Sequence, residues 1–297
     1  MDPVLFRLPF GPLQVRYYGV IFSLVFVGGY LLYRWQTRRA GYGDDLASEL
    51  LVPGFIGLLL GARLGHALFY NFDLLKADPL WFFKVWEGGL TSHGAAVGLI
   101  AALWWHARRK GLPLLDAADR FSFSAALGAG LVRLGNFFNS EIVGKPTQAF
   151  WAVRFPRYDG LPADFCPPRY PSQLVECALG LGLLGALLAA DRLMGREARP
   201  RGALAALFLI LYFSGRFLVE FLKERQGPFD DLWLSRGQLL SLPGVALGLA
   251  TLTLACRRRR SALGGGADAA QTPPKAPAPP CKTPAKAAGR RRKGRPK

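Results

Sequence analysis

The stretch that decides the fold lies at residues 202–222 and reads GALAALFLILYFSGRFLVEFL. Its length matches a helix that crosses the hydrocarbon core of a bilayer, which needs roughly 20 mostly apolar residues. The seven apolar runs of this kind cover residues 17–34, 50–70, 89–107, 119–138, 173–191, 202–222 and 237–256. With 51% hydrophobic residues, the chain is predicted to be an all-α integral membrane protein with seven transmembrane helices. This pattern excludes a soluble α/β enzyme, a secreted disulfide scaffold and a disordered chain.

The net charge of +18 is concentrated at one end of the chain. After Cys256, 13 residues are Lys or Arg, and the composition turns to Gly, Pro and Ala. Such a segment cannot bury a core. We therefore predict a transmembrane domain over 1–256 and a disordered basic cytoplasmic tail over 257–297.

The loops between the predicted spans differ in charge, and this difference predicts the orientation. Loops after the odd-numbered spans carry most of the basic residues: Arg34, Arg38, Arg39, Arg108, Arg109, Lys110, Arg192, Arg196, Arg199 and Arg201. Basic loops stay on the cytoplasmic side of a membrane. The N-terminus is therefore predicted to lie outside and the C-terminus in the cytoplasm.

Polar and charged residues inside the spans are costly and are candidates for function. Arg133 and Asn136 are three residues apart, and Tyr212, Arg216 and Glu220 follow at intervals of four. Each set is predicted to share one helix face. Two guanidiniums that face one cavity would suit a phosphate, because their planar donors match its oxygens.

Three further residues complete the set of candidates. Arg63 lies in the second predicted span, and pairing or function are equally open for it. Glu141, just past the fourth span, could hold an arginine or orient a substrate. His93 could be a base, since imidazole accepts a proton near neutral pH, or a hydrogen-bonded structural residue. The four cysteines and three histidines are spaced too irregularly for a metal motif.

Several short motifs occur in a fixed order along the chain. They are Tyr17-Tyr18-Gly19, Gly61-Ala62-Arg63-Leu64-Gly65, His93-Gly94, Arg133-Leu134-Gly135-Asn136-Phe137-Phe138-Asn139-Ser140-Glu141-x-x-Gly144, Pro171-Ser172-Gln173-Leu174-x-Glu176 and Arg216-Phe217-x-x-Glu220-Phe221. In this order they resemble the prolipoprotein diacylglyceryl transferase family over roughly residues 5–256. The motif that begins at Arg133 is the specific one. The chain departs from the family pattern at Ala95, Val132 and Tyr170, where Tyr170 replaces the usual histidine.

The resemblance implies a bacterial inner-membrane enzyme with its active site toward the periplasm. Such an enzyme transfers a diacylglyceryl group from phosphatidylglycerol to the lipobox cysteine of a prolipoprotein signal peptide, and glycerol 1-phosphate leaves. The family implies no metal and no organic cofactor, and nucleic acid is not an expected partner. Residues expected at catalytic positions are Tyr18, His93, Arg133, Tyr212 and Arg216. Those expected to bind phosphatidylglycerol are Arg63, Arg133, Asn136, Asn139, Glu141, Gly144, Arg216 and Glu220.

Two other functions are compatible with parts of the sequence. A transporter or flippase for an anionic lipid or solute would use intramembrane arginines equally well. Against it, the sequence contains no internal repeat. A membrane scaffold whose tail recruits nucleic acid would explain residues 261–297 but not Arg133 and Arg216.

Overall fold

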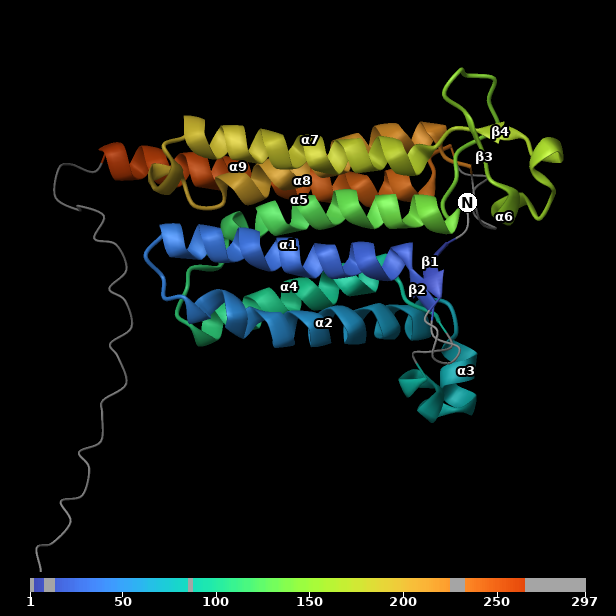
Figure 1. Ribbon diagram of the computed structural model, residues 1–297. Helices are drawn as coiled ribbons and strands as arrows, with labels where there is room; N and C mark the ends of the chain where they lie inside the picture. The colour runs from blue at the N-terminus through green and yellow to red at the C-terminus, as the bar shows by residue number, and fades with distance from the viewer. Residues whose placement is uncertain (1–2, 8–13, 85–87, 225–232, 265–297) are drawn as a thin grey trace, which may run out of the picture.

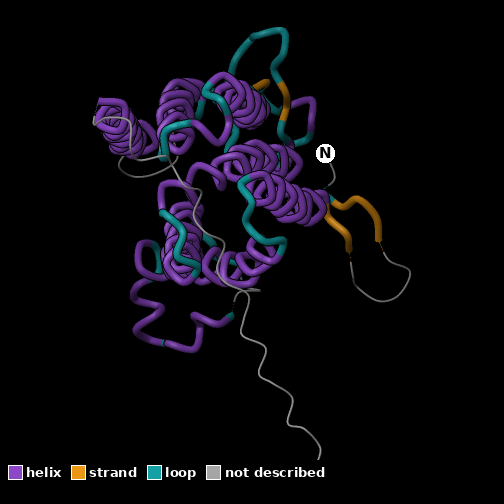
Figure 2. Tube along the Cα trace, turned by 90° about the vertical axis from the view of Figure 1, so that its left-hand side faces the viewer, coloured by secondary structure: helices purple, strands orange, loops and turns teal. Residues whose placement is uncertain are grey.

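A computed structural model of the chain describes residues 3–7, 14–84, 88–224 and 233–264. Long helices lie side by side in one bundle, with their axes roughly aligned (Figure 1). Viewed after a quarter turn, most of these helices are seen nearly end-on (Figure 2). The described part of the chain is therefore an elongated helical bundle.

Each predicted span coincides with a helix. These helices are α1 (Tyr17–Arg39), α2 (Asp45–Phe69), α4 (Ser92–Arg109), α5 (Leu114–Asn139), α7 (Ser172–Leu193), α8 (Ala203–Val219) and α9 (Arg236–Gly264). Helix α9 continues eight residues past the predicted domain boundary at 256, so residues 257–264 are helical rather than disordered. The rest of the predicted tail, 265–297, lies outside the described residues.

Five of these helices are long and apolar enough to cross a membrane: α1, α2, α7, α9, and α8 extended to Leu222. Helices α4 and α5 are not in this set, because they carry more polar side chains. Buried Asp116, Asp119 and Arg120 lie in α5, and buried His106 lies in α4. The chain is thus a multi-pass α-helical membrane protein.

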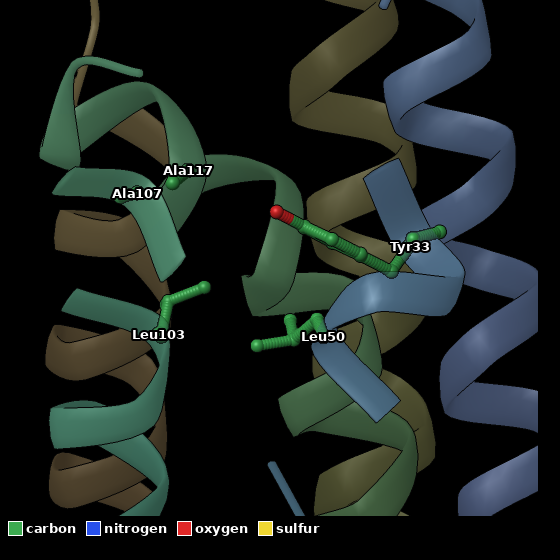
Figure 3. Packing of buried hydrophobic residues seen from close by; sticks show 6 residues of the cluster. Tyr33, Leu50, Leu103, Ala107 and Ala117 are labelled. Carbon is green, nitrogen blue, oxygen red and sulfur yellow. The ribbon is translucent and has the colours of Figure 1, made fainter. Parts of the chain in front are cut away.

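Helix packing depends on close backbone contacts and on clusters of buried side chains, three of which lie within the described residues. Gly61 of α2 lies directly against Gly94 and Gly98 of α4, where a Cβ atom would overlap backbone. Small residues allow such approach between membrane helices. Buried side chains from α1, α2, α4 and α5 form a cluster of Tyr33, Leu50, Leu103, Ala107 and Ala117 (Figure 3).

The short elements gather mainly at one end of the bundle, which we call the loop end (Figure 1). It carries the antiparallel pair β1 (Val4–Arg7) and β2 (Gln14–Arg16), then α3 (Phe72–Ala77), η1 (Pro79–Phe83) and α6 (Pro156–Asp159). It also carries η3 (Ala163–Phe165), η5 (Glu220–Leu222) and the antiparallel pair β3 (Val153–Arg154) and β4 (Pro168–Arg169). Element η4 (Arg196–Ala198) follows α7 at the opposite end.

A buried ionic network fixes the end of the bundle opposite the loop end. Asp191 of α7 accepts hydrogen bonds from Arg39 at 2.5 Å and from Arg199 at 2.9 Å. Arg120 of α5 pairs with Asp116 at 2.9 Å and with Glu197 at 2.7 Å. Because α1, α5, α7 and the loop before α8 share these bonds, their ends are held together.

Candidate active site

The loop end contains a group of buried and half-buried charges contributed by three helices. Arg133 near the end of α5, Glu176 in the first turns of α7 and Arg216 near the end of α8 meet here. The Glu176 carboxylate lies 3.3 Å from Arg133 Nε, 3.6 Å from Arg216 Nη1 and 2.9 Å from Lys223 Nζ. We call these four residues together with Glu220, whose Oε2 is 3.4 Å from Lys223 Nζ, the charge cluster.

Asn136 links the charge cluster to Glu141. The Arg133 Nη1 atom is 3.5 Å from Oδ1 of the Asn136 side chain, and Nδ2 of the same side chain donates to Glu141 Oε2 at 2.9 Å. The Asn139 amide donates to the other Glu141 oxygen at 3.2 Å. The predicted shared face of Arg133 and Asn136 is thus present, and Glu141 is oriented by two amides.

A tight reversal of the backbone brings Glu141 back to α5. Ser140 ends the helix with a φ of 58°, and Ile142 has a φ of 54°. Positive φ is unusual for a residue with a side chain, and for a β-branched residue it carries strain. The strained turn is what allows the Glu141 side chain to reach Asn136.

The first two residues of α7 hold this turn in place. Ser172 Oγ donates to the Ile142 carbonyl at 2.9 Å, and Gln173 Nε2 donates to the Glu141 carbonyl at 2.7 Å. Both side chains are fully buried. The Pro-Ser-Gln motif therefore supports the turn that carries Glu141.

Gly144 lies where two other backbone segments come together. Its amide donates to the Tyr170 carbonyl at 3.0 Å, and a Cβ here would overlap that carbonyl and come within 2.8 Å of Leu222 O. The backbone of Gly144 also forms an isolated antiparallel β-bridge with that of Lys223. Tyr170 contributes its carbonyl to this contact, and its ring lies 5.2 Å from that of Trp151.

Arg169 connects the loop between β3 and β4 to the segment that follows η5. It pairs with Asp159 at 2.7 Å and with Glu224, the residue after Lys223. Burial alone would lower the pKa of Arg169, but its bond to Asp159 and the charge of Glu224 outweigh this, so the pKa is raised. This pairing ties the β3–β4 loop to the segment that carries Lys223.

His93 and Tyr18 approach the same end from two other helices. His93 is the second residue of α4, and the charges of Arg216 and Arg133 act on its imidazole. Tyr18 is the second residue of α1 and packs its ring on Gly135, where a Cβ would lie 2.9 Å from the ring. Glu141 and Arg133 are its charged neighbours. Five helices thus contribute to the site.

Three predicted site residues have surroundings that the sequence did not indicate. Arg63 is 1% exposed and donates to the carbonyls of Trp81, Phe82, Lys84, Gly88 and Gly89. Its guanidinium also lies 4.0 Å from the centre of the Trp81 ring. Tyr212 stacks on Phe208 at 5.5 Å and packs against the apolar core of α5, α7 and α8. Glu220 follows the end of α8 and lies in η5, against Gly237 of α9.

An apolar groove of about 1070 Å³ runs between α2 and α4. Its walls are side chains such as Ile56, Leu60 and Val97, and His93 lies among its lining residues. The glycine contacts between α2 and α4 form its floor, since Gly57, Gly61 and Gly98 also line it. A hydrocarbon chain could lie in this groove close to His93.

Sequence reasoning assigned no role to Glu176 and did not consider Lys223. Glu176 lies inside a predicted span, so the cost of a charge within a membrane could have marked it. Lys223 falls one residue past a predicted span, where lysine is ordinary. Within the residues that the structure describes, no group of three or more His, Cys, Asp or Glu could hold a metal ion.

The fold and the site define a multi-pass membrane protein with the charge cluster at the loop end of its bundle. The family profile described as prolipoprotein diacylglyceryl transferase matches residues 3–254. A relative from Pseudoalteromonas atlantica is 39% identical over 269 residues, covering 88% of this chain and 92% of the relative. Relatives from Vibrio vulnificus and Vibrio cholerae are each 40% identical to this chain. Each alignment covers 87% of this chain and 93% of the relative. All three are named phosphatidylglycerol–prolipoprotein diacylglyceryl transferase. The chain belongs to the prolipoprotein diacylglyceryl transferase family.

Proposed function

We propose that this protein transfers the diacylglyceryl group of phosphatidylglycerol to the lipobox cysteine thiol of a prolipoprotein. The observation that carries this function is the meeting of Arg133 and Arg216 on one carboxylate, in a chain of this family. The relatives' names give the two substrates. The products are a thioether-linked prolipoprotein and glycerol 1-phosphate, so the protein acts in lipoprotein maturation.

Arg133 and Arg216 bind the lipid phosphate in this proposal. Planar guanidiniums match phosphate oxygens, and their charge stabilises the negative charge that builds on the phosphate as it leaves. Asn136, Asn139 and Tyr18 orient the head group by hydrogen bonds. Further residues that we expect to shape this subsite are Glu141, Gly144, Tyr212 and Glu220.

His93 is the proposed base, directly or through a water molecule. The cysteine thiol loses its proton to the imidazole, because the thiolate is the nucleophile. A sulfur–carbon bond then forms at the glyceryl carbon, and the bond from that carbon to the phosphate oxygen breaks. The electron pair leaves with glycerol 1-phosphate. Arg133 could instead act on the thiol itself.

The proposed topology has seven crossings in the bacterial inner membrane, with the loop end outside. The N-terminal strands lie at the loop end, and α9 ends at the opposite end (Figure 1). An odd number of crossings requires this arrangement. The basic residues Arg38, Arg108 and Arg192 lie toward that opposite end, which favours it as the cytoplasmic side.

A reconstituted reaction tests the function. Purified protein in detergent would receive phosphatidylglycerol and a lipobox peptide with one cysteine, and mass spectrometry would follow the peptide. We expect a mass increase of one diacylglyceryl group, absent for a cysteine-to-serine peptide. If both substrates are accessible and no adduct forms, the transferase function is wrong. A liposome flux assay would then test the transporter or flippase alternative.

A further inference from the structure

Glu176 is the shared partner of three cations in the charge cluster. Its carboxylate is buried, with its side chain 5% exposed, and it contacts Arg133, Arg216 and Lys223 from two other helical elements and the segment after α8. Without this carboxylate, the three cations would face one another with only Glu220, beside Lys223, as a counter-charge in a site of low dielectric constant. Glu176 therefore offsets part of the positive charge of these three cations.

The geometry of these contacts differs between the lysine and the arginines. Lys223 binds at 2.9 Å, whereas the arginine contacts of 3.3 and 3.6 Å exceed the 2.7–2.9 Å typical of charge-assisted hydrogen bonds. Glu176 Oε2 is buried and has no hydrogen-bond partner among the described residues. The two guanidiniums are attracted to the carboxylate but not locked onto it.

We propose that Glu176 is a positioning residue that acts as a built-in counter-ion and competes with the phosphate for Arg133 and Arg216. It holds the guanidiniums side by side before the lipid phosphate binds. Its negative charge then weakens the hold of the site on the anionic leaving group, so that glycerol 1-phosphate can depart. This role rests on the proposed function, because it assumes that the phosphate binds to these arginines.

The test compares Glu176→Gln with a matched variant on the same helix. Asp191 is also a buried carboxylate between two arginines, with its side chain 1% exposed. It lies fifteen residues along α7, roughly 22 Å away at 1.5 Å per residue. Asp191→Asn thus controls for the loss of any buried carboxylate from α7.

We expect Glu176→Gln to bind glycerol 1-phosphate more tightly and to turn over more slowly. Product inhibition should strengthen at least about fivefold, the effect of one unit charge near 4 Å even at the dielectric constant of water. The kcat should fall while KM for phosphatidylglycerol stays the same or falls. Asp191→Asn should lower thermal stability and leave the inhibition constant of glycerol 1-phosphate unchanged.

A purely structural role for Glu176 would give a different result. Loss of folded protein reduces the active fraction but does not tighten product binding, so an unchanged or weaker affinity in Glu176→Gln overturns the proposal. Calorimetric titration of the same variants with glycerol 1-phosphate gives the affinity independently of turnover. If wild-type protein forms no adduct, the proposed function itself has failed. The adduct assay therefore distinguishes that failure from a failure of the proposed role of Glu176, which the affinity measurements test.

A second pair of variants tests the proposed role of Glu176 if Glu176→Gln does not fold. Lys223→Gln removes one cation and should weaken binding of glycerol 1-phosphate. The double variant Glu176→Gln with Lys223→Gln loses one negative and one positive charge, so its charge cluster has the same net charge as that of the wild type. It should bind at least about fivefold more tightly than Lys223→Gln alone. Equal affinity of these two variants contradicts the proposal.

Discussion

At the residue scale, Arg133 and Arg63 show how the same side chain takes two roles in one membrane protein. Arg133 meets a carboxylate and an amide at the loop end. Arg63 instead donates to carbonyl groups of the segment from Trp81 to Gly89. A guanidinium has five donors in a fixed fork, so it can satisfy several carbonyls at once. The predicted role of Arg63 in lipid binding is therefore less well supported than a role in fixing this loop.

Arg63→Lys separates these two roles. A lysine cannot reach the same carbonyls with its single ammonium group, and each buried carbonyl left unpaired costs about 1–3 kcal/mol. We expect a clear drop in the thermal midpoint in detergent, with KM for phosphatidylglycerol unchanged in the folded fraction. A large rise in KM for phosphatidylglycerol with an unaltered thermal midpoint would instead indicate that Arg63 binds the lipid.

Gly144→Ala tests the close contact below the strained turn. The added methyl group would overlap the Tyr170 carbonyl, and overpacking of this kind costs about 1–3 kcal/mol. Because the displaced loop carries Glu141, we expect activity to fall more than stability. Gly182→Ala in α7 is the matched control, since a Cβ there meets nothing within 4 Å. Similar activity of the two variants would contradict this description of Gly144.

At the scale of elements, the site depends on how α4 is placed against α2. His93 lies at the start of α4, and the position of that helix is set by contacts of Gly94 and Gly98 with Gly61 and Gly57. Backbone meets backbone there, so no side-chain rearrangement can make room for a larger residue.

Gly98→Leu should therefore move α4 as a unit. A Cβ at Gly98 would overlap the Gly57 carbonyl, and the whole leucine side chain would push the two helices apart. We expect kcat to fall about tenfold or more, since small misplacements of catalytic groups can cost about a hundredfold. The measurement is the rate of adduct formation, with Ile100→Leu as a control, because Ile100 is an exposed residue of α4 outside the apolar groove. Equal rates would show that α4 is not positioned by this contact.

At the scale of the whole molecule, the sequence predicts the long helices well and the site only in part. Apolar runs of spanning length mark each helix, because lipid demands them. The shared face of Arg133 and Asn136 follows from helical spacing. The joining of α5, α7 and α8 through Glu176 depends on tertiary packing, which no local pattern records. The short elements of the loop end lack a hydrophobic period, so they were not predicted.

The ionic network at the opposite end predicts how stability depends on pH. Burial alone would raise the pKa of Glu197, but bonds from Arg120 and Arg39 outweigh it and lower the pKa below its usual value of 4.5. Its stabilising contribution is then fully present above pH 4.5 and is lost as the pH falls through the lowered value. We expect the thermal midpoint of the wild type to drop in this acidic window. Glu197→Gln should show a smaller drop, and identical pH profiles would contradict the assignment.

In the proposed reaction, the cations at the loop end bind the lipid phosphate during diacylglyceryl transfer. The most direct test measures the rate of peptide adduct formation for Arg133→Ala and for Arg109→Ala, an arginine stacked on Trp105 at the opposite end of α4. We predict that Arg133→Ala lowers kcat by about a hundredfold or more, whereas Arg109→Ala stays near the wild-type rate. Near-normal turnover of folded Arg133→Ala would contradict the account.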